Sequence, residues 1–129
     1  MIKNETDFIK KIHLIISVCI VFPVSFSYGF YSDLFFDIHP KSIDELNFLK
    51  SIMLLYIGFS ILWTIGIFNN KYLKIALISN MIFMLCLSLG RLLSLVKDGI
   101  PSFAYVFGTF AELFLGVYGI FILKRFKRI

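Results

Sequence analysis

The sequence predicts an all-α polytopic membrane protein, a four-helix transmembrane bundle, and two observations lead to this fold class. The first is composition: of 129 residues, 59% are hydrophobic, 16 are Phe, and only 16% of the chain is charged. Soluble domains carry about 25% charged residues and cannot hide this much apolar surface. The second is that apolar residues gather in four runs, each near the roughly 20 residues that a helix needs to cross a hydrocarbon core.

Local signals predict where these helices begin and end. We expect them at about residues 12–30, 43–68, 72–96 and 102–123, with a kink at Pro23. The string Ser42-Ile43-Asp44-Glu45 has the pattern of a capping box, which starts the second helix at Ile43. Gly99 suits the left-handed residue that ends the third helix, and Pro101 suits the start of the fourth. The connections are short, so neighbouring helices are antiparallel and residues 1–129 form a single transmembrane domain.

Lys and Arg are distributed unequally between the two ends of the predicted bundle. Nine lie in the N-terminal tail, the 69–74 turn and the C-terminal tail: Lys3, Lys10, Lys11, Lys71, Lys74, Lys124, Arg125, Lys127 and Arg128. The other two connections hold only Lys41 and Lys97. Because positively charged segments stay on the cytoplasmic side, both termini of this multi-pass chain are expected in the cytoplasm. The net charge of +5 then reflects membrane sidedness, and nucleic acid is excluded as a partner.

Three charged residues lie inside the predicted spans, namely Lys50, Arg91 and Glu112. Each costs on the order of a few kcal/mol in the bilayer interior unless it is paired or hydrated. Arg91 and Glu112 lie on the two helices of one hairpin, with Glu112 about 7–8 Å deeper along the axis, which a long Arg side chain can reach. We therefore expect a charge-assisted Arg91–Glu112 pair, and Lys50 and Asn47 can complete the cluster.

Helical spacing places this pair on two polar faces. One face of the third helix carries Asn80, Met84, Leu87, Arg91, Ser94 and Asp98. One face of the fourth carries Tyr105, Gly108, Thr109, Glu112, Gly116 and Gly119. The second face is rich in small residues, which allow membrane helices to approach closely.

Two interpretations of the charges remain open. In the first, Arg91 and Glu112 form a latch that fixes the register of the helices, and Lys50 extends outward. In the second, the charges line a polar pocket that holds a head group or carries out proton chemistry. Two cations beside one anion leave a surplus positive charge, which suits an anionic ligand. The candidate ligand-binding residues are therefore Asn47, Lys50, Arg91 and Glu112.

Other side chains give no comparable signal. Cys19 and Cys86 differ in predicted depth by about seven residues, or roughly 10 Å, so a disulfide is not expected. His39 lies near Asp33 and Asp37, but without the spacing of metal ligands. A phosphate-binding glycine loop, a paired-cysteine metal motif and a serine elbow are all missing from the sequence. No metal, cofactor or catalytic residue is therefore predicted.

Several strings of the sequence resemble those of a known family. They are Leu46-Asn47-Phe48-Leu49-Lys50, Gly90-Arg91-Leu92-Leu93-Ser94-Leu95, Asp98-Gly99-Ile100-Pro101-Ser102 and Glu112-Leu113. Over about residues 10–124 the chain resembles a small bacterial membrane family catalogued as domain of unknown function 4345. The family usually has Arg at the position of Lys50, a difference that keeps the charge but loses bidentate geometry. The resemblance implies four helices and a bacterial inner membrane, and it marks Asn47, Lys50, Arg91, Gly99, Pro101 and Glu112.

The leading hypothesis is a non-catalytic membrane protein that binds a lipid-like or anionic ligand, or a partner helix, through the charged cluster. One alternative is a small membrane enzyme that acts on a lipid or isoprenoid, with Glu112 as general acid or base. Another is a proton-coupled transporter subunit, for which a Glu near the membrane midplane is suggestive. Such a subunit needs to oligomerise, and Ala104-x-x-x-Gly108 offers one seam. The expected partners are membrane lipids, a second copy of the chain or another membrane protein.

Overall fold

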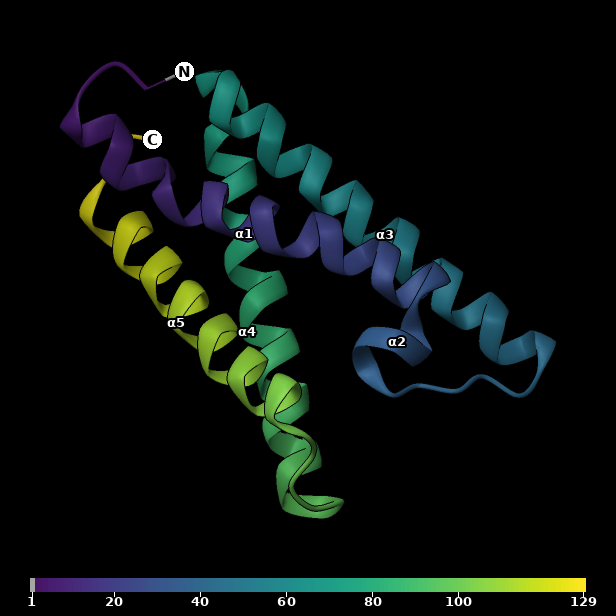
Figure 1. The fold of residues 1–129 in the computed structure, drawn as a ribbon. Coiled ribbons are helices and arrows are strands. Elements are labelled where there is room, and N and C mark those ends of the chain that lie inside the picture. Colours follow the sequence, from purple (N-terminus) through teal and green to yellow (C-terminus); the bar gives the residue numbers. More distant parts are fainter. Residues whose placement is uncertain (1) are drawn as a thin grey trace.

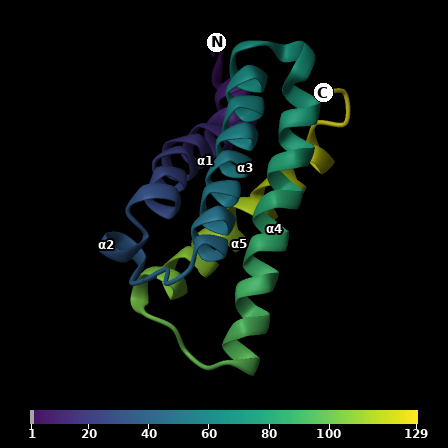
Figure 2. The same cartoon turned by 90° about the vertical axis from the view of Figure 1, so that its right-hand side faces the viewer.

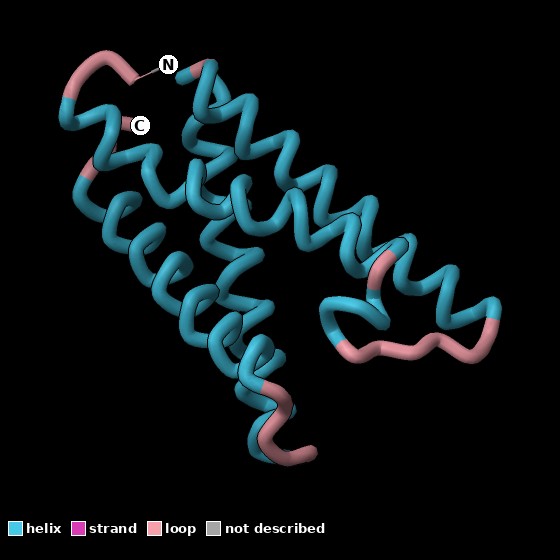
Figure 3. The backbone as a smooth tube through the Cα atoms, viewed as in Figure 1, coloured by secondary structure: helices cyan, strands magenta, loops and turns pink. Residues whose placement is uncertain are grey.

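The computed structural model describes residues 2–129, and within that range every regular element is a helix. The helices are α1 (Glu5–Phe30), α2 (Ser32–Phe36), α3 (Ile43–Phe68), the 3₁₀ turn η1 (Asn70–Tyr72), α4 (Leu73–Lys97) and α5 (Phe103–Arg125). Irregular backbone is confined to the chain ends and to the connections at the two ends of the bundle (Figure 3). The predicted all-α class is confirmed, and four helices are long and apolar enough to cross a membrane.

The outer surface of these helices is itself apolar. At most 39% of the most apolar stretch of each long helix is buried inside the protein. Large side chains such as Phe48, Phe110 and Phe114 are more than 60% exposed. Monomeric soluble proteins rarely expose contiguous apolar surface on this scale, whereas a surrounding bilayer covers it. The helices therefore indicate a multi-pass membrane protein.

The four long helices form two hairpins that diverge from one another (Figure 1). The most extensive packing joins α1 to α3 and α4 to α5, and α3 also packs against α4. Contacts of α1 with α4 and α5 are sparse. Both chain ends lie at the end where the hairpins meet, and α2 and the 98–102 connection lie toward the other end (Figure 2). We call these the terminal end and the loop end.

The helix boundaries follow local capping chemistry. Ser42 and Glu45 form the predicted capping box, and α3 begins at Ile43. Gly99 has a φ of 110°, which a residue without Cβ adopts easily, and it ends the α4 segment as expected. The first helix begins at Glu5 and not near residue 12, because the Asn4 side chain accepts a hydrogen bond from the Asp7 amide and caps it. Hydropathy detects only the apolar part of that helix.

One element was not predicted. The connection between α1 and α3 contains the short helix α2, which is followed by its C-cap residue Asp37 with a φ of 54°. The Ser32 hydroxyl donates to the Ile38 carbonyl at 3.1 Å, and Phe36 stacks on Tyr28 with ring centroids 4.5 Å apart. These contacts fold α2 back against α1, so that it lies beside the opening between the hairpins.

Candidate functional site

The predicted ion pair between α4 and α5 is formed. The Arg91 Nε lies 2.8 Å from Glu112 Oε2, and Nη2 lies 3.2 Å from Oε1. This two-point geometry gives each carboxylate oxygen one guanidinium donor. The side chains are only 20% and 16% exposed, so both charges are largely removed from the surroundings. Arg91 and Glu112 therefore neutralise each other within the protein.

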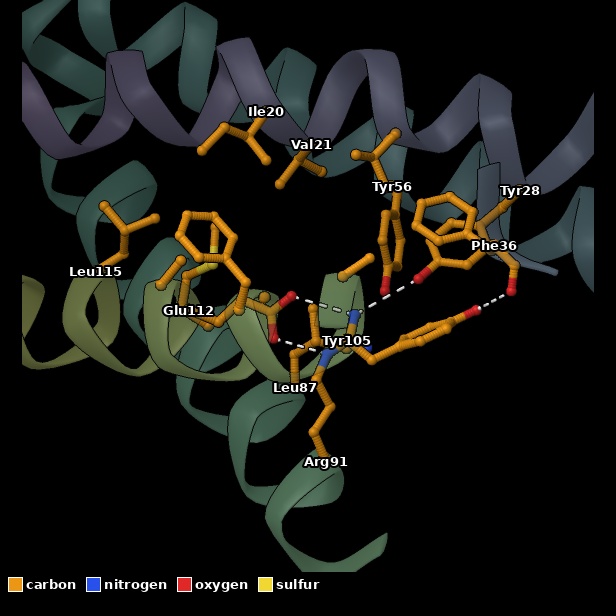
Figure 4. Close-up of a pocket in the computed structure, with 16 residues that line it drawn as sticks. Ile20, Val21, Tyr28, Phe36, Tyr56, Leu87, Arg91, Tyr105, Glu112 and Leu115 are labelled. Carbon is orange, nitrogen blue, oxygen red and sulfur yellow. Dashed lines mark hydrogen bonds and ion pairs between the residues drawn. The ribbon is translucent and has the colours of Figure 1, made fainter. Parts of the chain in front are cut away.

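The same guanidinium also contacts the other hairpin. Arg91 Nη2 lies 3.5 Å from the Tyr28 hydroxyl of α1, and the guanidinium lies 5.5 Å from the centre of the Tyr105 ring. Figure 4 shows the Arg91 side chain rising from α4 between Glu112 and Tyr28. The pair consequently lies where the two hairpins face each other, and not only within the α4–α5 interface.

A second link between the hairpins runs through α2. The Tyr105 hydroxyl of α5 donates to the Phe36 carbonyl at 2.9 Å (Figure 4). Phe36 in turn stacks on Tyr28, and Tyr28 meets Tyr56 of α3 edge to face at 5.6 Å. These aromatic side chains form a wall around Arg91 at the loop end of the bundle.

A cavity of about 190 Å³ lies beside the ion pair, between the hairpins. Its polar side is formed by Arg91, Glu112 and the tyrosines 28, 56 and 105. The rest of the lining is aliphatic or aromatic and includes Val21, Val24 and Leu115 (Figure 4). A dry cavity of about 150 Å³ accommodates benzene, so this space suits a small apolar group or the first carbons of a longer chain.

The cavity reaches the outer surface between α1 and α5. Ile20 of α1 and Phe107 of α5 both line it, and they are 46% and 63% exposed. These two helices pack only sparsely against each other. The cavity therefore opens sideways, on the apolar surface that a membrane would cover.

Lys50 does not join the Arg91–Glu112 pair, so the predicted cluster of three charges is not formed. Its Nζ lies 3.4 Å from the Gly29 carbonyl and 5.6 Å from the centre of the Phe30 ring. The physical reason is rotation about the helix axis. Leu49, Met53 and Tyr56 form the buried face of α3, and a residue one position from Leu49 is turned about 100° away from it.

The other residues that the sequence marked lie outside the cavity. Asn47 is exposed, and its backbone carbonyl accepts from the Ser51 hydroxyl at 2.9 Å. Gly99 and Pro101 are exposed in the connection between α4 and α5. Of the four candidate ligand-binding residues, the structure thus brings together only Arg91 and Glu112. Whether Asn47 or Lys50 contacts a ligand stays a prediction.

The aromatic part of the site was missed by sequence reasoning. The sequence does not mark Tyr28, Phe36 or Tyr56 as site residues, because a single aromatic residue in an apolar helix gives no sign of what it faces. Tyr105 had a usable signal, since it shares the helix face of Glu112. Ala104 and Gly108, expected as a seam between copies, also line the cavity, and oligomerisation stays a prediction.

Two further polar side chains are buried away from the cavity. His13 is 1% exposed, and the centre of its ring lies 5.1 Å from the centre of the Tyr118 ring. Asn80 is fully buried. Neither the His13 ring nitrogens nor the Asn80 amide atoms have a hydrogen-bond partner among residues 2–129. Buried polar groups normally find partners, so these two cost stability. Neither residue lines the cavity beside Arg91.

Potential metal ligands do not converge. His39 Nε2 pairs with Asp37 Oδ1 at 2.7 Å on the surface of the loop end. Within the described residues no group of three His, Cys, Asp or Glu side chains is placed to hold a metal ion. Cys19 and Cys86 are free thiols, as expected.

Comparison with known proteins gives a family but no activity. Neither curated proteins nor solved structures provide a match to this chain. The family model described as domain of unknown function (DUF4345) matches residues 9–123, nearly the whole length of the chain. The chain therefore belongs to the family of this domain of unknown function.

Proposed function

We propose that the protein is a membrane protein that binds a lipid-like molecule. The polar group of this molecule lies at Arg91, and its hydrocarbon part lies in the cavity. The observation that carries this proposal is the position of Arg91 at the polar side of an otherwise apolar cavity. An amphiphile likewise has a polar group at one end and a hydrocarbon part at the other. The sideways opening between α1 and α5 supports access from the lipid phase.

The arrangement gives Arg91 and Glu112 different roles. Glu112 holds the guanidinium in a fixed orientation through two hydrogen bonds. Tyr105 covers one face of the guanidinium, and the Tyr28 hydroxyl lies beside Nη2. A guanidinium fixed in this way presents its remaining N–H groups in one geometry, which lowers the entropy cost of binding a polar group.

Bound molecules test this proposal directly. The protein is purified in mild detergent, and native mass spectrometry compares the wild type with Gly108→Leu. A Cβ added at Gly108 would meet only Glu112 Oε1, at 3.8 Å, so a Leu side chain has room to grow into the cavity without breaking the helix packing. We expect an added mass on the wild type that disappears from Gly108→Leu, while both variants keep the same oligomeric state.

Lys50→Ala tests whether the ligand binds at Arg91 and Glu112 alone or also needs Lys50, the third charge of the cluster that the sequence suggested. Lys50 is charged but lies outside the cavity, so Lys50→Ala should retain the added mass. If the added mass disappeared from Lys50→Ala and persisted in Gly108→Leu, the ligand would bind elsewhere. If the wild type carried no added mass, the pair would be a structural latch only.

We also propose that both termini are cytoplasmic. Five cations gather at the terminal end around one surface cleft: Lys10, Lys124, Arg125, Lys127 and Arg128. Positively charged segments are retained on the cytoplasmic side, which supports this orientation. A reporter active only in the cytoplasm, fused to the C-terminus, should be active in cells. Activity of a reporter restricted to the opposite side would reverse the orientation.

A further inference from the structure

The charge balance of the cavity narrows the class of ligand. The only ionised side chains that line the cavity in the described chain are Arg91 and Glu112. Each oxygen of the carboxylate receives one guanidinium donor, so the pair is electrically balanced. Lys50, which would have supplied a surplus positive charge, is directed to the Gly29 carbonyl instead. An anionic head group would therefore enter a site without net positive charge.

Hydrogen-bonding groups of the cavity that have no partner also bear on the class of ligand. Among residues 2–129, neither Arg91 Nη1 nor the Tyr56 hydroxyl makes a hydrogen bond, and both residues line the cavity. The Tyr56 hydroxyl points toward the Arg91 guanidinium in Figure 4. Each Glu112 oxygen can accept a further hydrogen bond. The site thus offers donors and acceptors side by side.

We infer that the ligand is an uncharged amphiphile, a hydrocarbon with a hydroxyl group, and not an anionic lipid. This inference rests on the proposed function. A hydroxyl accepts from Arg91 Nη1 and donates to Glu112 or Tyr56, so it uses both kinds of group. An anion only accepts, and it would meet the Glu112 carboxylate at close range in a poorly solvated space, where an uncompensated charge is costly.

Two photoreactive probes of equal length test the inference. Both carry an alkyl diazirine in an eight-carbon chain, and one ends in a hydroxyl whereas the other ends in a sulfonate, which stays anionic at neutral pH. The protein is reconstituted in phosphatidylcholine vesicles, and cross-linked peptides are mapped by mass spectrometry. Labelling of cavity residues Val21, Val24 and Leu115 is divided by labelling at Phe114, which is 68% exposed and reports the probe concentration in the lipid.

We expect the hydroxyl probe to label the cavity at least about tenfold more than the sulfonate probe in the wild type, a ratio that corresponds to about 1.4 kcal/mol. Glu112→Gln removes the negative charge and leaves Arg91 unbalanced, so sulfonate labelling should rise and the preference should shrink or reverse. The double variant Arg91→Gln/Glu112→Gln is neutral again and should keep sulfonate labelling low. It serves as the matched control if Glu112→Gln alone fails to fold.

The outcomes separate the two proposals. Equal or stronger cavity labelling by the sulfonate probe in the wild type would overturn the uncharged ligand and leave the lipid-like site standing. Cavity labelling by neither probe above the level at Phe114 would overturn both. A preference for hydroxyl that is unchanged in Glu112→Gln would show that charge balance does not select the ligand, and it would also overturn the inference.

Discussion

The two halves of α5 face very different surroundings. Toward the loop end, Tyr105, Gly108 and Glu112 border the cavity between the hairpins. Toward the terminal end, Gly116 and Gly119 pack closely on α4. A Cβ at Gly108 would touch one atom at 3.8 Å, whereas a Cβ at Gly116 would lie 2.7 Å from the Leu85 side chain. The small residues on one face of α5 therefore border an open space toward the loop end and pack tightly against α4 toward the terminal end. We call these parts of α5 the open half and the tight half.

This difference separates the part of the hairpin that supports the fold from the part available to a ligand. In the tight half, Ile122 is fully buried. In the open half, two polar contacts join the hairpins, from Arg91 to Tyr28 and from Tyr105 to Phe36. Substitutions in the tight half should change stability through packing, and those in the open half through charge and hydrogen bonding.

The largest effect should come from separating the ion pair. Arg91→Ala leaves Glu112 without a partner in a poorly solvated site, and we expect a loss of about 3 kcal/mol in the free energy of unfolding. Arg91→Met combined with Glu112→Leu removes both charges and should lose less than Arg91→Ala alone. Unfolding in mixed micelles of increasing dodecyl sulfate content, followed by circular dichroism, measures both. A double variant less stable than the single one would show that the pair itself holds α4 and α5 together.

A substitution in the tight half of α5 should have the second-largest effect on stability. Gly116→Ala places a Cβ within 2.8 Å of two Leu85 side-chain atoms and 3.3 Å from the Leu85 backbone nitrogen. Overpacking of this kind costs about 1–3 kcal/mol. Gly108→Ala has room for its methyl group, and in a helix interior Ala is favoured over Gly by roughly 0.5–1 kcal/mol, so it should be neutral or stabilising. Thermal midpoints in the same detergent compare the two, and equal shifts would contradict the contrast between the halves.

The sequence predicts the helices and the Arg91–Glu112 pair, but it does not predict which residues surround the pair. Apolar runs and the capping box located three of the four long helices to within about two residues, because these signals are local. Arg91 and Glu112 were paired by depth along one hairpin, which the helical rise determines. Lys50 was assigned by depth alone. The α3 segment is apolar on all sides, so its sequence does not reveal that Leu49 and Tyr56 face inward and Lys50 does not.

Tyr28 and Tyr105 show where such reasoning ends. Each belongs to a different hairpin, and their roles depend on α2 folding back against α1. That fold is stabilised by the Ser32–Ile38 hydrogen bond and by the stacking of Phe36 on Tyr28. Both contacts depend on how the chain folds back in three dimensions, which neither periodicity nor hydropathy reports. Tyr105 shares the helix face of Glu112 and could be expected beside it, but the rest of the aromatic wall could be found only in the structure.

The smallest effect should come from the link between α5 and α2. Tyr105→Phe removes the hydroxyl that donates to the Phe36 carbonyl at 2.9 Å and keeps the ring over Arg91. The loss of one hydrogen bond of this kind costs about 1 kcal/mol, and here it should act locally. Hydrogen exchange should become faster at the amides of Leu34, Phe35 and Ile38, with little change in α3. Tyr28→Phe is the matched control, because its hydroxyl lies at the longer distance of 3.5 Å from Arg91 and is not bonded to α2. Equal acceleration in both variants would mean that the aromatic rings, and not the Tyr105 hydrogen bond, hold α2 beside the cavity.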